Sequence, residues 1–238
     1  MPDSTRVDRL IGWRRDLHQR PATAFAEDEA AAYVADVLHG LGFDVATGIG
    51  GTGVVGSLTL GRGGRVIGLR ADLDGLPLDE VPGRAYGSRN AGAMHACEHD
   101  GHMAMVLGAT AELAHLANAE GGPDGVVRAV VSYTREFAPT VNDVGLIALV
   151  VAAAREALGS VRVTGEAPAI TASEDFGVFG GHIPACFAFV GNGTEPGRGG
   201  TPLHSRDYDF NDDILTTGVD YYLAVVSAVL RADAIRPS

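Results

Sequence analysis

The stretch "RVIGLRADLD", residues 65–74, limits most strongly which folds are open to this chain. It is almost wholly apolar until its acidic end, which is typical of a strand buried on both faces of a sheet. Helical patterns with apolar positions on one face occupy residues 4–19, 27–39, 100–118, 143–158 and 212–232. Shorter β-like runs occupy residues 43–48, 53–60, 126–137, 161–165 and 185–193. This alternation predicts an α/β domain built around a central sheet.

The charge and cysteine content exclude several classes of protein. A net charge of −12 over 238 residues argues against binding to nucleic acid or to anionic membranes. The apolar runs, such as residues 146–154, are too short to cross a bilayer, and the first ten residues lack the apolar core of a signal peptide. Two cysteines do not make a disulfide framework. We therefore expect a reduced, cytoplasmic protein.

The stretch "MHACEHDGHMAM", residues 94–105, holds the residues best suited to bind a metal. Cys97 and His99 are two residues apart, so in an extended segment both side chains lie on one face. A thiolate and an imidazole that converge in this way suit zinc, manganese or cobalt. His95 and His102 flank the pair. Alone, the pattern leaves open that His95 is a loop residue and His102 a residue on a helix face.

Acidic residues follow the apolar strand at Asp72 and Asp74. Sites in α/β proteins gather at the carboxyl ends of strands, and acids there ligate a metal or orient a ligand histidine. The alternative is that both acids cap backbone amides in a loop. Glu174 and Asp175, in "SEDF", stand at an expected helix start, where acids are favoured in any case.

His204 lies in the Gly-rich loop "TEPGRGGTPLHSRDYDFND", residues 194–212, before the last helix. Binding residues concentrate on such loops, although a solvated histidine is the plain alternative. Cys186, within an apolar run, is expected to be a core residue. No role is assigned to the remaining histidines, which are His18, His39, His115 and His182.

Taken together and in this order, several stretches resemble the two-metal amidohydrolases that include aminoacylases, hippurate hydrolases and indole-acetyl-amino-acid hydrolases, of metallopeptidase clan MH. The matching stretches are "RRDLHQRP", "TGIGGTGVVG", "LRADLDGLPLDE", "MHACEHDGHMAMVLGA", "FAPTVND", "ASEDFGVF" and "LHSRDYDFND". The resemblance implies a single three-layer domain over residues 1–238, with a central mixed sheet flanked by helices. It also implies hydrolysis of the amide bond of N-acyl amino acids with the help of zinc or manganese, with cobalt and nickel as alternatives, and up to two ions per chain.

By the same resemblance, four residues receive roles. Cys97 matches the thiolate that bridges the metals, while His99 and His204 match ligand histidines. Asp74 matches the acid that supports the metal site, and we count it among the catalytic residues. Glu98 stands between Cys97 and His99, where the family usually has glycine.

The chain departs from the family in the middle. A Pro-Ala-Glu-Glu motif, which supplies the general base and a metal ligand, is absent, as are the ligand histidine that follows it and nearly all of the lid domain that usually forms the dimer. We place the junction of this deletion near residues 118–128. The strand that begins at Gly125 puts Glu136 at the offset of the family's ligand Glu, so we hypothesise that this strand substitutes in the sheet and that Glu136 serves as ligand and catalytic residue. Arg135 would then occupy the base position, where it cannot act as a base. The alternative is a solvent-facing Arg-Glu pair.

Three functions remain open at this stage. The chain is a compact metal-dependent amidohydrolase, a weakly active or non-catalytic metal-binding remnant of one, or a fragment or engineered deletion that needs a partner. For the first two we expect a small-molecule partner, no nucleic acid, no membrane, and a monomer, because the dimerising lid is missing.

Overall fold

The computed structural model describes residues 4–60, 64–117, 125–130, 140–168, 174–195 and 197–231. Its helices are α1 (Ser4–His18), α2 (Asp28–Gly40), α3 (His99–Ala117), α4 (Val144–Leu158), α5 (Gly177–Gly180) and α6 (Leu215–Arg231), with short 3-10 turns η1 (Ser160–Arg162) and η2 (Asp212–Ile214). Its strands are β1 (Asp44–Ile49), β2 (Gly53–Leu60), β3 (Val66–Leu69) and β4 (Gly125–Val130). All five long helices expected from the sequence are present, with ends shifted by only a few residues.

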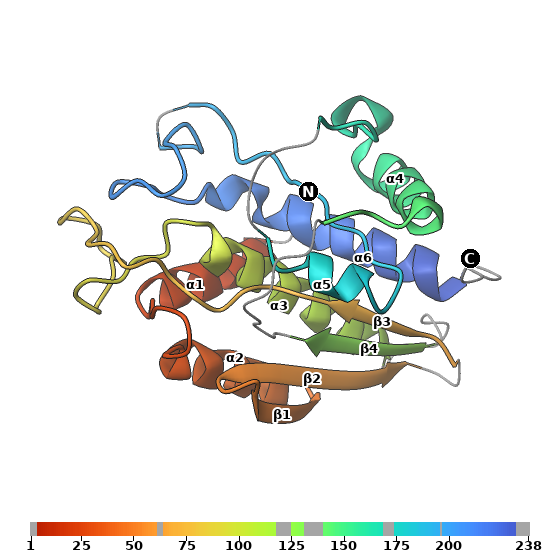
Figure 1. The fold of residues 1–238 in the computed structure, drawn as a ribbon, viewed down its shortest axis with the longest axis horizontal. Helices are drawn as coiled ribbons and strands as arrows, with labels where there is room; N and C mark the ends of the chain where they lie inside the picture. The colour runs from red at the N-terminus through yellow and green to blue at the C-terminus, as the bar shows by residue number, and fades with distance from the viewer. Residues whose placement is uncertain are drawn as a thin grey trace.

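The strands form one mixed sheet in the order β1-β2-β4-β3, which confirms the α/β fold with a central mixed sheet (Figure 1). β2 pairs antiparallel with β1 and β4, and β4 pairs parallel with β3. The strand that begins at Gly125 therefore does enter the sheet, between β2 and β3, as hypothesised. Helix α2 packs on β1 and β2, and α6 contacts β3.

The apolar stretch of β3 is buried on one face only, contrary to the prediction. Leu69 is buried, but Val66 is 54% exposed, because the alternation of a strand points these two residues to opposite faces. An apolar strand sequence alone did not show whether a second layer would cover it.

Two runs expected to be strands are irregular. Residues 160–162 form η1, and Val161 is fully exposed. In the run 185–193, the Asn142 side chain binds both polar groups of the Phe187 backbone, at 2.9 and 2.7 Å. The Asp143 N–H donates to the Ala185 carbonyl at 2.9 Å. The segment before α4 thus satisfies backbone groups that a neighbouring strand would otherwise pair.

The core lies between the sheet and the long helices. The larger cluster joins α2, α3 and α6 to side chains of β2 and β3, and Val34, Leu38, Leu107 and Leu113 are buried in it. By length and hydropathy, residues 212–231 could span a membrane, a criterion that core helices also meet. Here α6 packs between α3 and α4, and Figure 1 shows α4 on the side of α6 away from the sheet.

A second, smaller cluster packs beneath the candidate site. It brings Met94 and Ala96 against Tyr208 and Phe210. Gly101, in the first turn of α3, is required there because a Cβ at this position would collide with the Phe210 ring. The segment before α3 and the segment before α6 are therefore held face to face, although they are more than 100 residues apart in the sequence.

Candidate metal centre

Cys97 and His204 lie side by side, as the resemblance implied. The His204 Nε2 is 3.3 Å from the Cys97 Sγ. The His204 backbone N–H donates to the Ala96 carbonyl at 2.7 Å, which fixes the loop against the residue before the cysteine. A thiol and an imidazole from distant parts of the chain thus meet at one point.

His99, the first residue of α3, is oriented by Asp74. Its Nδ1 is 2.8 Å from the Asp74 carbonyl oxygen and 3.1 Å from its Oδ1. Since both oxygens accept, Nδ1 carries the proton, and Nε2 is the atom left to bind a metal. Burial tends to lower the pKa of His99, but Asp74, the Cys97 thiol and Asp72 outweigh burial and raise it well above its usual value. Without a metal, Nε2 therefore also carries a proton, which a metal ion would displace on binding. The prediction that Asp74 supports the site is consistent with this contact.

The backbone is strained at two residues of the site. Glu98 has a φ of +66° and His204 a φ of +64°, a region that side chains other than glycine rarely adopt. Each such residue costs on the order of 1–3 kcal/mol, and such strain gathers at functional sites. The presence of Glu98 where the family usually has glycine therefore adds strain beside Cys97. Its carboxylate accepts a hydrogen bond from the Tyr208 hydroxyl at 2.7 Å.

The donor chemistry of this site fits a divalent metal. One thiolate and two imidazoles are typical ligands of zinc, and a carboxylate behind a ligand histidine is its usual support. Within the described part of the chain, however, no group of three or more His, Cys, Asp or Glu side chains is arranged to hold an ion. The donors are therefore suitable, but they make hydrogen bonds with one another and with Asp74 instead of surrounding a common point. These donors are Cys97, His99 and His204.

A second acidic group proves to belong to an ion-pair cluster. Asp72 and Asp175 both contact the Arg70 guanidinium, and Glu174 contacts it at 3.1 Å. The Arg70 side chain is only 8% exposed. Burial raises the pKa of Asp72, although His99 and Arg70 oppose this. Of the two strand-end acids, Asp74 faces the histidine and Asp72 faces the arginine.

The remaining predicted residues have varied outcomes. Glu136 lies outside the described residues, and so does the larger part of the expected junction. His102 lies on α3 with its side chain 43% exposed, and its Nε2 is 3.9 Å from a Glu98 oxygen. His95 is buried, with neither ring nitrogen hydrogen-bonded within the described chain, and burial lowers its pKa to about 4. Cys186 is half-buried rather than a full core residue.

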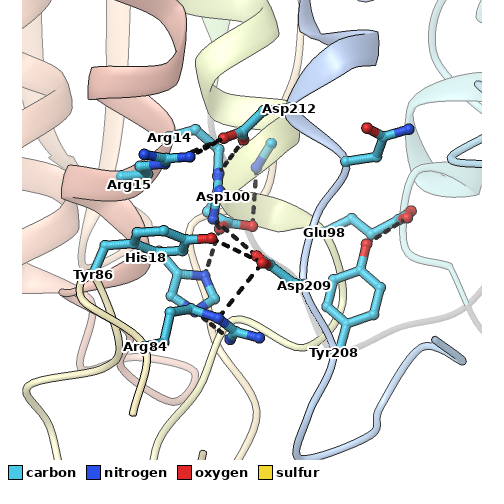
Figure 2. Close-up of polar contacts among 12 residues, drawn as sticks. Arg14, Arg15, His18, Arg84, Tyr86, Glu98, Asp100, Tyr208, Asp209 and Asp212 are labelled. Atoms are coloured by element: carbon cyan, nitrogen blue, oxygen red, sulfur yellow. Dashed lines mark hydrogen bonds and ion pairs between the residues drawn. The ribbon is translucent and has the colours of Figure 1, made fainter. Parts of the chain in front are cut away.

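A buried polar network that was not predicted lies beside the site (Figure 2). His18 Nδ1 is 2.7 Å from Asp100, which follows His99, and His18 Nε2 is 3.2 Å from Glu80. Arg14, one turn earlier on α1, is 3.7 Å from Asp100 and 2.7 Å from Asp212. The signal was visible in "RRDLHQRP", where Arg14 and His18 are four residues apart and share a helix face.

The comparisons with known proteins agree with this geometry. The chain is 41% identical over 106 residues to the N-acyl-L-amino acid amidohydrolase of Geobacillus stearothermophilus, covering 44% of this chain and 28% of that protein. It is 45% identical over 101 residues to the hippurate hydrolase of Campylobacter jejuni, covering 42% and 26%. The chain thus spans less than a third of the length of these relatives.

Among solved structures, the fold matches the Bacillus subtilis YxeP protein, described as a dinuclear metal binding peptidase of family M20, with a TM-score of 0.81. That match covers 97% of this chain at 19% identity, so it shows the fold alone. The glutaminyl cyclase of Tannerella forsythia also matches, with a TM-score of 0.59, over 95% of this chain and 99% of that one at 14% identity.

The family assignment follows from the sequence itself. Residues 68–133 and 118–228, which together make up more than half of the chain, match peptidase family M20/M25/M40 in two overlapping segments. Both site segments lie inside the match, and their residues converge in the structure. The chain belongs to peptidase family M20/M25/M40.

Proposed function

We propose that the chain is a metal-dependent amidohydrolase that cleaves the amide bond of N-acyl amino acids. The observation that carries the proposal is the contact of Cys97 with His204, with His99 beside them and oriented by Asp74. Two relatives with more than 40% identity over the matched segment are an N-acyl-L-amino acid amidohydrolase and a hippurate hydrolase. Their names support both the reaction class and this class of substrate.

Cys97, His99 and His204 would hold the ion, for which zinc and manganese are our first candidates. A divalent metal supplies Lewis-acid polarisation of the amide carbonyl when it is bound. The chain's own residues prepare the site. Asp74 keeps the proton of His99 on Nδ1, and the Ala96 carbonyl fixes the backbone of His204.

Hydrolysis also needs a general base to take a proton from the attacking water. Glu174 is paired with Arg70, and the same Oε1 accepts the Phe176 N–H at 3.0 Å, which orients this carboxylate toward the Arg70 cluster. Glu136 stays our candidate for an extra ligand, and it lies outside the described residues. Because a general base typically contributes ~10²–10⁴-fold to the rate, we expect slow turnover.

A second candidate function is a weakly active or non-catalytic metal-binding remnant. It is favoured by one observation, which is that the described residues assemble no group of three ligands. In this reading Cys97 and His204 keep their contact, but no hydrolysis follows.

Metal content and turnover together separate the two candidates. The purified chain is loaded with zinc or manganese, its metal is counted by elemental mass spectrometry, and hydrolysis of benzoylglycine and N-acetyl amino acids is followed. We expect bound metal and slow hydrolysis, both lost in Cys97→Ala. Metal without hydrolysis would support the remnant, and no metal in either protein would contradict both. Glu136→Gln then shows whether Glu136 takes part.

The assembly and location of the protein are proposals of the same kind. We propose a monomer that acts in the cytoplasm on small molecules. The support is the missing dimerising lid, the net charge of −12 and the two unpaired cysteines. Light scattering of the purified chain checks the monomer, and a dimer at micromolar concentration would contradict it.

A further inference from the structure

We propose that Arg14 is a positioning residue that holds the segments carrying His99 and His204 in place around Cys97. The inference rests on the proposed function, because it assigns a role toward the same metal centre. Arg14 lies on α1, which contributes no side chain to the centre itself, and it acts through carboxylates on both segments (Figure 2).

Arg14 is fully buried, which is costly for a charged side chain unless it is paired. Its guanidinium lies 2.7 Å from Asp212, 3.4 Å from Asp209 and 3.7 Å from Asp100. It also stacks over the Tyr86 ring, with its central carbon 4.7 Å from the ring centroid. A planar guanidinium offers five N–H donors in a fixed geometry, whereas a lysine offers three donors from a single nitrogen, so lysine is a poorer match for three carboxylates.

These carboxylates come from the two segments that form the centre. Asp100 directly follows His99 in the first turn of α3. Asp209 and Asp212 follow His204 in the segment that leads into α6. The buried Arg14 guanidinium therefore links the segment that follows His99 to the segment that follows His204.

His204 itself has few anchors. It is exposed and has a strained backbone, and it is held by the contact with Cys97 and by one backbone hydrogen bond to Ala96. Its position therefore depends on the residues that follow it. Among these, Tyr208 bonds Glu98, and Phe210 packs on Gly101, so the same two segments meet again beside the arginine.

The same helix provides a matched control. Arg6 is also on α1 and also pairs with carboxylates, at 2.8 Å from Asp220 and 3.6 Å from Glu112. Those partners lie on α6 and α3, away from the two ligand segments. Arg6→Met thus removes an arginine from α1 without touching the centre.

The first test measures cobalt affinity through the thiolate-to-cobalt absorption band of the full chain. We expect Arg14→Met to weaken binding about 10- to 100-fold, the range found for residues that support metal ligands. We expect Arg6→Met to bind like the wild type and Arg14→Lys to recover only part of the loss. Wild-type affinity in folded Arg14→Met would overturn the proposal.

The second test needs no metal, so it still decides the inference if the wild type binds no cobalt and the proposed function fails. With Cys186→Ser to remove the other thiol, His204→Cys is introduced, and formation of the disulfide between positions 97 and 204 is followed in oxidised glutathione. We expect about 10-fold slower formation when Arg14→Met is added, and no change with Arg6→Met. Equal rates with and without Arg14 would overturn the inference.

If Arg14→Met does not fold, Asp212→Ala takes its place in both tests. This variant leaves Arg14 paired with Asp100 and Asp209 but removes the shorter of its two contacts to the segment after His204. We expect the same direction of change in cobalt affinity and in disulfide formation. A folded Asp212→Ala chain that matches the wild type in both would overturn the proposal.

Discussion

Two buried arginines each contact three carboxylates, but they have opposite consequences for the candidate metal centre. Arg14 is fully buried and joins the segments that carry His99 and His204. Arg70 is 8% exposed and joins the end of β3 to the segment before α5, where its partners Asp72 and Glu174 are 20% and 28% exposed. Arg14 thus helps to assemble the centre, whereas Arg70 neutralises acids that the sequence offered as site residues.

The part that a carboxylate plays therefore depends on the cation it contacts, and its position in the sequence does not reveal that cation. Asp72 and Asp74 are two residues apart after one strand, and yet one meets Arg70 and the other His99. The predictions below test how far the two arginines differ.

The largest effect is expected for Arg14→Met on stability. Removing the buried guanidinium takes one cation from each of Asp100, Asp209 and Asp212, and breaking a buried ion pair in this way costs about 3–5 kcal/mol. Urea denaturation measures the loss of unfolding free energy. Arg6→Met, whose partners are partly exposed, should cost less than about 1 kcal/mol. Equal losses for the two variants would remove the distinction that we draw for Arg14.

The pH dependence of stability tests the same network through His18. Burial tends to lower the pKa of His18, but hydrogen bonds to Asp100 and Glu80 raise it from 6.5 to about 9. Because the folded pKa is the higher one, this stabilisation is fully present below pH 6.5 and is lost as pH rises to about 9.

We expect a loss of about 2–3 kcal/mol across that window, measured by urea denaturation at each pH. His18→Gln should be less stable at pH 6 and should show a much flatter profile. A wild-type profile that is flat from pH 6 to 9 would show that His18 is not held as a cation.

A smaller effect is expected for Arg70→Met. Two of its three carboxylate partners, Asp72 and Glu174, keep partial access to water, which can replace the lost hydrogen bonds, so we expect a loss of about 1–3 kcal/mol. Disulfide formation between positions 97 and 204, followed as for Arg14, should be unchanged. If Arg70→Met slowed disulfide formation as much as Arg14→Met does, both arginines would position the centre.

The smallest effect concerns the backbone between the two ligands. Glu98→Gly and Glu98→Ala both remove the hydrogen bond with Tyr208, but only glycine relieves the positive φ. We therefore expect Glu98→Gly to be the more stable variant by about 1 kcal/mol, measured by thermal and urea unfolding. If alanine is tolerated as well as glycine, position 98 carries no strain.

Apolar periodicity predicted the long helices and the α/β fold, and the motifs that resemble the family offered Cys97, His99, His204 and Asp74 as candidate site residues. Apolar periodicity and motif spacing are local signals. Predictions made from them agree with the structure where each element depends only on neighbours within a few residues. For the same reason they failed at residues 161–165 and 185–193, because strand formation depends on a partner strand. In the second run, Asn142 and Asp143 supply hydrogen bonds to Phe187 and Ala185 instead.

Only the tertiary structure decided which charges meet. Arg14 and Asp212 are 198 residues apart, and Arg70 and Asp175 are 105 apart, so no local pattern pairs them. Burial then makes each pairing matter, because a charge removed from water must find a partner within contact distance. The sequence offered candidate ligands, and packing between α1, α3 and the segment before α6 decided which side chains hold their segments together.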